Sequence, residues 1–321
     1  MRPLRRLSLA CLLAPLAATA ASAQSYPTRP IRLVVPFAAG GPADFLGRVI
    51  GAKLGETLGQ QVVVDNRPGA NTILGAQAVA RAEPDGYTLL MAIDGTLVMN
   101  PFLYGKLPYD AGKDFAPISL IATVPSAFVV NNAVPAATLA DFVAREKAKP
   151  GTYLIGSSTP TTQVGIELFN MLAGIKLGIV PYKGGSTLVT GLIGGEIPAG
   201  IDSFNVTLPL YRAGRLKILA VMTSVRLAQA PELTPIADIY PGYDLGIWQS
   251  IVAPAGTPRA VIDRLAVAIR AALTDPELRE KIRVAGIEPA FSNSPQEFVA
   301  FVRAQAQTRS KVIRAIGLKL D

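Results

Sequence analysis

Residues 31–58 read IRLVVPFAAGGPADFLGRVIGAKLGETL, and this stretch decides the fold of the chain. The mostly apolar run 31–35 predicts a buried strand, and the Pro- and Gly-rich run 36–44 predicts a loop. Leucine and isoleucine side chains spaced four residues apart then predict an amphipathic helix, which we expect Asp44 to cap. Free N–H groups in a first helical turn attract anions. The stretch therefore predicts a site for an acidic small molecule.

The N-terminal residues indicate export. Three arginines precede an apolar run of 14 residues at 7–20, and Ala-Ser-Ala at 21–23 forms an A-x-A cleavage site. The run is shorter than the roughly 20 residues of a membrane-spanning helix. A lipoprotein would be cleaved before Cys11, but Ser-Leu-Ala before it is a poor lipobox. We therefore predict a signal peptide at 1–23, a mature chain from Gln24 and a periplasmic location.

Composition limits the function of the mature chain. Cleavage leaves 298 of the 321 residues, enough for two α/β lobes, and lowers the formal charge from +8 to +5. The basic residues are scattered, which argues against a nucleic-acid partner. The chain has no histidine and its one cysteine lies in the signal peptide, so triads, histidine metal sites and thiol chemistry are excluded. We expect a non-enzymatic protein without cofactor or metal; an enzyme that works through Asp residues is the alternative.

Short apolar runs alternate with helical patterns along the chain, and this order predicts an α/β layered fold. Two adjacent strands meet at Pro125-Ser126, as expected where the chain crosses between lobes. A second crossing is predicted between Met222 and Trp248, where three prolines and a glycine break regular structure. The predicted lobes are 24–124 with 224–321, and 125–223. The expected strands are 31–35, 61–65, 87–91, 118–122, 127–131, 152–156, 178–181, 197–201, 217–222 and 247–253.

Four strand-to-helix loops carry chemistry suited to an anion: 36–44, 94–96, 157–162 and 182–186. Ligands of open α/β sheets bind beyond the carboxyl ends of the strands, where all four loops are expected. In the third loop Thr159 is the expected N-cap, so that the N–H groups and hydroxyls of Thr161 and Thr162 face the cleft. Each loop taken alone is also compatible with ordinary turn chemistry, and Asp94 and Asp202 with capping roles.

Two further side chains leave alternatives open. Lys183 could neutralise a ligand carboxylate or simply face solvent from its turn. Trp248, the only tryptophan, could pack in the core or form a wall of the cleft. The candidate ligand-binding residues are Phe37, Ala38, Gly40, Gly41, Asp44, Asp94, Thr96, Thr159, Thr161, Thr162 and Asp202.

A series of motifs resembles one known family. YPTRPIRLVVPFAAGGPAD, VVVDNRPGA, DGYTLL, NPFLYGKLPYD, DFAPISL, VPYKGG and APAGTP follow in order over nearly the whole mature chain. The chain is similar to the Bug family of periplasmic receptors of tripartite tricarboxylate transporters. The resemblance implies a two-lobe, type II periplasmic-binding-protein fold, with a mostly parallel sheet flanked by helices in each lobe. It also implies a carboxylate held between the lobes, and delivery to membrane permease subunits or a role in sensing. We expect the receptor to be a monomer.

The resemblance is uneven among the site residues. The first loop, with Phe37, Ala38, Gly40, Gly41 and Asp44, matches the family pattern. The third loop departs from it: the family commonly shows Gly-x-Gly-Ser/Thr followed by His-Leu, where this chain has Ser-Ser-Thr-Pro at 157–160 and Gln-Val at 163–164. Asp94 is also unusual at its place. An added carboxylate would repel a second ligand carboxylate or accept hydrogen bonds from an amine or hydroxyl. A monocarboxylate with such groups, or with an aromatic part, is therefore as well supported as a di- or tricarboxylate.

Overall fold

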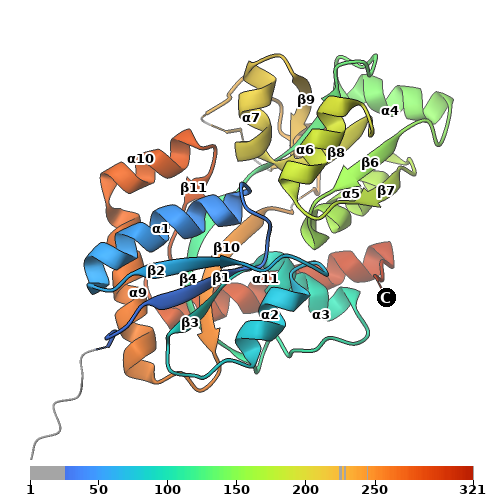
Figure 1. Ribbon diagram of the computed structural model, residues 1–321. Helices are drawn as coiled ribbons and strands as arrows, with labels where there is room; N and C mark the ends of the chain where they lie inside the picture. Colours follow the sequence, from blue (N-terminus) through green and yellow to red (C-terminus); the bar gives the residue numbers. More distant parts are fainter. Residues whose placement is uncertain (1–25, 224–225, 228, 244, 321) are drawn as a thin grey trace, which may run out of the picture.

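The computed structural model describes residues 26–223, 226–227, 229–243 and 245–320. The predicted signal peptide 1–23 and the predicted start at Gln24 lie outside these ranges, as does residue 224, where one predicted lobe boundary falls. Within the described chain, two β-sheets flanked by helices form two lobes (Figure 1).

The first sheet has the strand order β11-β4-β10-β3-β1-β2. Strands β1 to β4 run in one direction, while β10 lies antiparallel between β3 and β4, and β11 lies antiparallel to β4. Most strands of this sheet therefore run in the same direction, as expected, but the sheet is mixed because β10 and β11 run in the opposite direction. The strands span Ile31–Val35 (β1), Val62–Asn66 (β2), Thr88–Ile93 (β3), Phe115–Val124 (β4), Ile247–Pro254 (β10) and Glu288–Pro289 (β11).

The second sheet has the order β7-β6-β8-β5-β9 and repeats this arrangement. Strand β5 is antiparallel to both of its neighbours, while β6 pairs in parallel with β7 and β8. Both lobes thus contain an inserted strand, β10 or β5, that directly follows a crossing between lobes. The strands span Ser126–Asn131 (β5), Leu154–Ser157 (β6), Gly178–Pro181 (β7), Ala199–Ser203 (β8) and Leu216–Val221 (β9).

Helices cover both faces of the sheets (Figure 1). Around the first sheet they are α1 (Pro42–Leu58), α2 (Ile73–Ala80), a π-helical turn (Gly95–Met99), α3 (Asn100–Leu103), α9 (Arg259–Thr274), α10 (Pro276–Val284) and α11 (Pro295–Ile316). Around the second they are α4 (Leu139–Ala148), α5 (Pro160–Ala173), α6 (Gly185–Gly194) and α7 (Phe204–Arg212), and the short α8 (Ile236–Ile239) follows β9.

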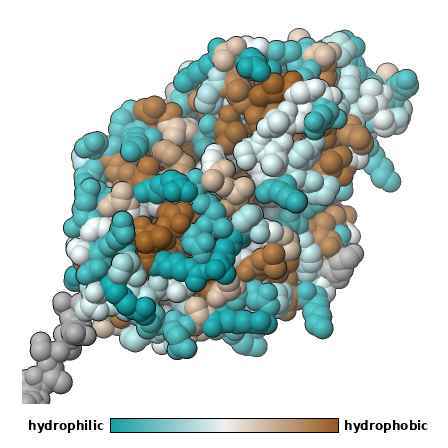
Figure 2. Space-filling view, in the orientation of Figure 1, coloured by the Kyte–Doolittle hydropathy of each residue, from teal (hydrophilic) through white to brown (hydrophobic). Residues whose placement is uncertain are grey.

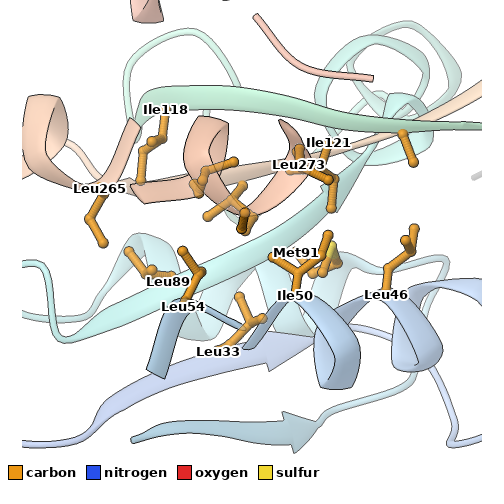
Figure 3. Close-up of a cluster of buried hydrophobic side chains, with 14 of the residues drawn as sticks. Leu33, Leu46, Ile50, Leu54, Leu89, Met91, Ile118, Ile121, Leu265 and Leu273 are labelled. Carbon is orange, nitrogen blue, oxygen red and sulfur yellow. The ribbon is translucent and has the colours of Figure 1, made fainter. Parts of the chain in front are cut away.

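The apolar stripe of α1 anchors the site-bearing loop to the first sheet. Leu46, Ile50 and Leu54 are buried and point toward the strand side chains of the same cluster (Figure 3). Each leucine or isoleucine buried in this way contributes about 1.5–3 kcal/mol. Proline at the first helical position and Gly59 in the left-handed conformation just after the helix set its two ends. The helix N-terminus therefore has a fixed position beyond the carboxyl end of β1.

The long terminal helix α11 packs against both lobes. Near its start, Phe298 contacts Trp248 edge to face at a centroid distance of 6.0 Å. Trp248 is 2% exposed and belongs to this core cluster, so the core-packing alternative for the tryptophan is the one found. Near the end of α11, Ile313 packs in the cluster that contains Phe128 of the second lobe. One helix therefore bridges the two cores (Figure 1).

Candidate functional site

A pocket lies between the two lobes, where the carboxyl ends of several strands meet. Its cavity volume is about 30 Å³, room for about one water molecule. A wider outer pocket of about 520 Å³ adjoins it and shares Phe37, Ala38 and Ser158 with it. The inner pocket is lined by Phe37, Ala38, Gly41, Pro42, Ala43, Ile93, Ser158, Thr159, Gly184, Gly185, Ser186, Asp202, Ser203, Ile247 and Gln249.

The first loop has a different cap from the one predicted. Gly41, not Asp44, is the N-cap of α1, and it provides no side-chain hydrogen bond. Asp44 occupies the third helical position and turns its carboxylate to the loop: it accepts hydrogen bonds from Gly40 N at 3.0 Å and from Arg48 and Asn66. Burial alone would raise the pKa of Asp44, but these donors together hold it below its usual value. Asp44 therefore braces the loop, and Gly41, Pro42 and Ala43 at the start of the helix line the pocket.

Replacing Asp44 tests this brace. The Asp44→Ala variant loses every hydrogen bond made by a carboxylate that is 5% exposed. We expect the free energy of unfolding at pH 7 to fall by about 1–3 kcal/mol. Urea denaturation followed by circular dichroism measures the change.

Asp141 provides the matched control, because it makes the same kinds of contact in α4. It accepts from a backbone N–H four residues earlier and pairs with Arg145 four residues later, but its side chain is 38% exposed. We expect Asp141→Ala to cost less than about 1 kcal/mol. Equal losses for the two variants would contradict a special role for Asp44.

The second loop connects the lobes instead of lining the pocket. Asp94 is fully buried at the end of β3, and the hydroxyl of Thr161, at the start of α5, donates to its Oδ2 at 2.8 Å. Burial raises the pKa of Asp94 to about 6, against the opposing charge of Arg309. Thr96, two residues further on, is buried and shares a 2.8 Å hydrogen bond with Thr72. Neither Asp94 nor Thr96 is among the lining residues of the two pockets.

The third loop forms a helix cap. Thr159 is the N-cap of α5, as predicted, and its hydroxyl accepts from Thr162 N at 3.1 Å. The hydroxyl of Thr162 accepts in return from Thr159 N at 3.0 Å, which completes a capping box. The expectation that Thr161 and Thr162 present their N–H groups and hydroxyls to the cleft is not met here, because the cap and Asp94 engage the Thr162 N–H and both hydroxyls. Thr159 alone of the three lines the pocket.

Asp202 lines the pocket from the end of β8 and is fully buried. Its Oδ1 accepts from the Ser158 hydroxyl at 3.0 Å and from Ser203 N at 2.7 Å, whereas its Oδ2 has no hydrogen-bond partner. Burial raises the pKa of this carboxyl to about 6. Gly185, the first residue of α6, lies so close that a Cβ there would be 2.7 Å from both carboxylate oxygens. The N-terminus of α6 therefore approaches the carboxylate directly.

Comparison with known proteins decides the family. The model described as "Tripartite tricarboxylate transporter family receptor" matches residues 46–318. The chain belongs to this receptor family. Its members are solute receptors, a non-enzymatic class, so the predicted resemblance and the prediction of a non-enzyme are both confirmed.

Relatives in this receptor family match along nearly their whole length. A UPF0065 protein of Bordetella bronchiseptica is 36% identical, over 98% of this chain and 94% of its own. Protein BugT of Bordetella pertussis is 33% identical, over 93% of each chain. Among solved structures, R. palustris Rpa4515 with adipate has a TM-score of 0.88 at 34% identity and covers 92% and 99%. MatC from Rhodopseudomonas palustris with bound malate has a TM-score of 0.84 at 27% identity and covers 90% and 100%. The two-lobe periplasmic-binding-protein fold is thereby confirmed.

Sequence reasoning missed part of the receptor's pocket wall. Gln249 and Ile247 of β10 line it, although they lie more than 200 residues after the first loop. The structure buries Gln249, which is 2% exposed. An uncharged polar residue inside an apolar predicted strand was the sequence signal that could have marked it as a site residue. The fourth loop was recognised as suited to an anion, and its Gly184 and Gly185 line the inner pocket. Lys183 is exposed and lines only the outer pocket.

Two other kinds of site are absent from the described residues. They contain no group of three or more His, Cys, Asp or Glu side chains placed to hold a metal ion. None of their helices is both long and apolar enough to cross a membrane. On the face shown in Figure 2, hydrophobic side chains form separate patches among hydrophilic ones. The inter-lobe pocket remains the strongest candidate site in this part of the chain.

Proposed function

We propose that this protein is a periplasmic receptor that holds a small organic acid between its lobes and delivers it to a tripartite transporter. In this proposal residues 24–124 with 224–321 form one lobe and residues 125–223 form the other. One chain supplies both sides of the pocket, so the receptor acts as a monomer. The predicted signal peptide at 1–23 supports the location, and the family supports the transport role.

One observation carries the proposal: two helix N-termini without side-chain caps meet at one buried pocket. Helix α1 begins after Gly41 in the first lobe and α6 after Gly184 in the second, and a glycine N-cap has no side chain to accept a hydrogen bond from the first turn. Their first N–H groups thus have no side-chain cap, and helix N-termini favour negative charge. Relatives solved with adipate and with malate support a carboxylate as the ligand.

The size of the inner pocket indicates how the ligand enters. The inner cavity of about 30 Å³ has room for about one water molecule, so an organic acid also needs space from the adjoining pocket of about 520 Å³ or from a wider separation of the lobes. We propose that the lobes separate to admit the ligand and close on it about the crossings near residue 125 and near residues 223–241, as in hinge closure. Micromolar binding requires about 8 kcal/mol, which an enclosed carboxylate with several N–H donors supplies.

Titration calorimetry tests binding. The protein is unfolded and refolded to remove any co-purified ligand, then titrated with dicarboxylates, hydroxy acids, amino acids and aromatic acids at pH 7. We expect at least one acid to bind at micromolar concentration and to raise the melting temperature. No heat and no thermal shift with the whole panel would remove the support for a receptor.

Affinity capture from membranes tests delivery. Liganded receptor that carries a C-terminal tag is incubated with detergent-solubilised membranes, and captured proteins are identified by mass spectrometry. Permease subunits of a tripartite transporter are the expected partners. Capture of a membrane sensor in their place would support the sensing alternative.

A further inference from the structure

Two buried oxygen acceptors without partners belong to residues that line the inner pocket from different lobes. Oδ2 of Asp202 belongs to the second lobe and Oε1 of Gln249 to the first, and both residues line the cavity. Asp202 is fully buried and Gln249 is 2% exposed. A buried acceptor left without a donor costs about 1–3 kcal/mol, so a pair of them in one pocket requires an explanation.

The charged groups that line the pocket indicate which kind of partner the free oxygen of Asp202 needs. Among the described residues that line the inner pocket, Asp202 is the only one with a charged side chain. Its Oδ1 is already satisfied by Ser158 and by the backbone of Ser203. The free oxygen therefore needs a hydrogen-bond donor, and an acid that binds beside an ionised Asp202 without offering such a donor is disfavoured by charge repulsion.

The contact with α6 fixes where the donor must be on the ligand. Because a Cβ on Gly185 would lie 2.7 Å from both oxygens of Asp202, the carboxylate touches the first turn of α6. That turn carries N–H groups without a side-chain cap, which suit the carboxylate of a ligand. A ligand carboxylate held by these N–H groups would therefore lie beside Asp202, so the ligand atoms next to that carboxylate are the ones placed to donate to Oδ2.

We propose that Asp202 and Gln249 select organic acids that carry an ammonium or hydroxyl donor on the carbon next to the carboxyl group. The ligand carboxylate takes the N–H groups of α1 and α6, and its neighbouring donor satisfies Oδ2 of Asp202 and Oε1 of Gln249. Unsubstituted acids leave both acceptors without partners and bind less tightly. This inference rests on the proposed receptor function and specifies its class of ligand.

Acids that share one carbon skeleton provide the test. Succinate, malate and aspartate form one series, and propionate, lactate and alanine form a second, so that each series differs only in the substituent next to the carboxyl group. Calorimetric titrations of the refolded protein are expected to show at least tenfold tighter binding of one donor-bearing member than of the plain acid. Comparison of malate with aspartate, or lactate with alanine, identifies the donor as hydroxyl or ammonium.

The Asp202→Asn variant tests the residue itself. We expect at least a tenfold loss of affinity for the preferred donor-bearing acid and less than a threefold change for the plain acid. Asp65→Asn is the control, because Asp65 pairs with Arg32 and Arg67 outside the pocket, and its affinities are expected to match the unmodified chain. The titrations of the two acid series into the unmodified protein test the proposal even if a variant fails to fold.

The outcomes distinguish failure of the inferred selectivity from failure of the proposed receptor function. If plain acids bind as tightly as their substituted partners, or Asp202→Asn keeps the preference, the inferred selectivity is overturned while the receptor function stands. If no acid of any series binds, both are overturned.

Discussion

Lowering the pH from 7 to 5 is expected to stabilise the ligand-free protein by about 2–3 kcal/mol, the opposite of ordinary acid denaturation. Burial raises the pKa of Asp94 and of Asp202 from 3.8 to about 6. A folded-state pKa above the unfolded value means that the folded protein binds protons more tightly. The stabilisation is complete below pH 3.8 and is lost as the pH rises through about 6. Roughly 1.3 kcal/mol per group falls between pH 5 and 7.

Composition removes one competing contribution in this pH window. The chain has no histidine, the side chain that ordinarily titrates there. The carboxyls whose pKa is lowered act in the opposite sense, but their stabilising effect is lost only as the pH falls to about 4 and below. They are Asp44, Asp65, Asp110 and Asp275.

Urea unfolding at pH 5, 6 and 7 measures the effect. The Asp94→Asn and Asp202→Asn variants are each expected to remove about half of the difference between pH 5 and pH 7, because each removes one buried titrating carboxyl. Asp65→Asn, at a half-buried ion pair, is expected to leave it unchanged. A free energy of unfolding that falls from pH 7 to pH 5 would show that these carboxyls do not hold protons more tightly in the folded state.

The Gly185→Ala variant is expected to bind the preferred acid at least thirtyfold more weakly, about 2 kcal/mol. Its methyl group would lie 2.7 Å from the oxygens of Asp202, so either the carboxylate or the N-terminus of α6 must move. Overpacking of this kind costs about 1–3 kcal/mol. The displaced group is one that we place against the ligand, so affinity should fall even where the fold survives.

Gly194 offers the same substitution in the same helix without the clash. It is the last residue of α6, and a Cβ there meets nothing within 4 Å. Gly194→Ala is expected to keep the affinity of the original chain and to gain up to about 1 kcal/mol of stability from helix propensity. Calorimetry with one acid on both variants makes the comparison, and equal affinities would refute the close approach at Gly185.

Local patterns allowed much of the fold to be predicted. The run 31–58 forms the expected strand, loop and helix, since its apolar spacing matches one buried strand and one helix stripe. The antiparallel placement of β5 and β10 was not predicted, because a strand's own sequence does not specify the direction of its partners. The lobe boundaries remain a prediction.

The candidate site was less predictable, since the direction of each polar side chain depends on distant partners. Asp94 and Thr161 are 67 residues apart in sequence, and nothing near either one indicates that they meet. The partnership of Asp44 with Arg48 was accessible, because residues four apart on a helix are neighbours. Gln249 could be recognised only once β10 was seen beside β3.

The single residue between β4 and β5 limits how far the nearby ligand-binding groups can move when the lobes rotate. Pro125 alone separates the two strands, and its carbonyl accepts from Phe204 N at 2.7 Å, so the chain has no slack there. Asp202 pairs with Ala127 and Gln249 with Ala122, within three residues of this pivot. Rotation about a pivot displaces nearby atoms least and remote atoms most. In the closure that we propose, the two acceptors therefore stay close to their final spacing, whereas the outer pocket changes more. The inner end of a ligand is then held before closure is complete, and its outer end is less constrained.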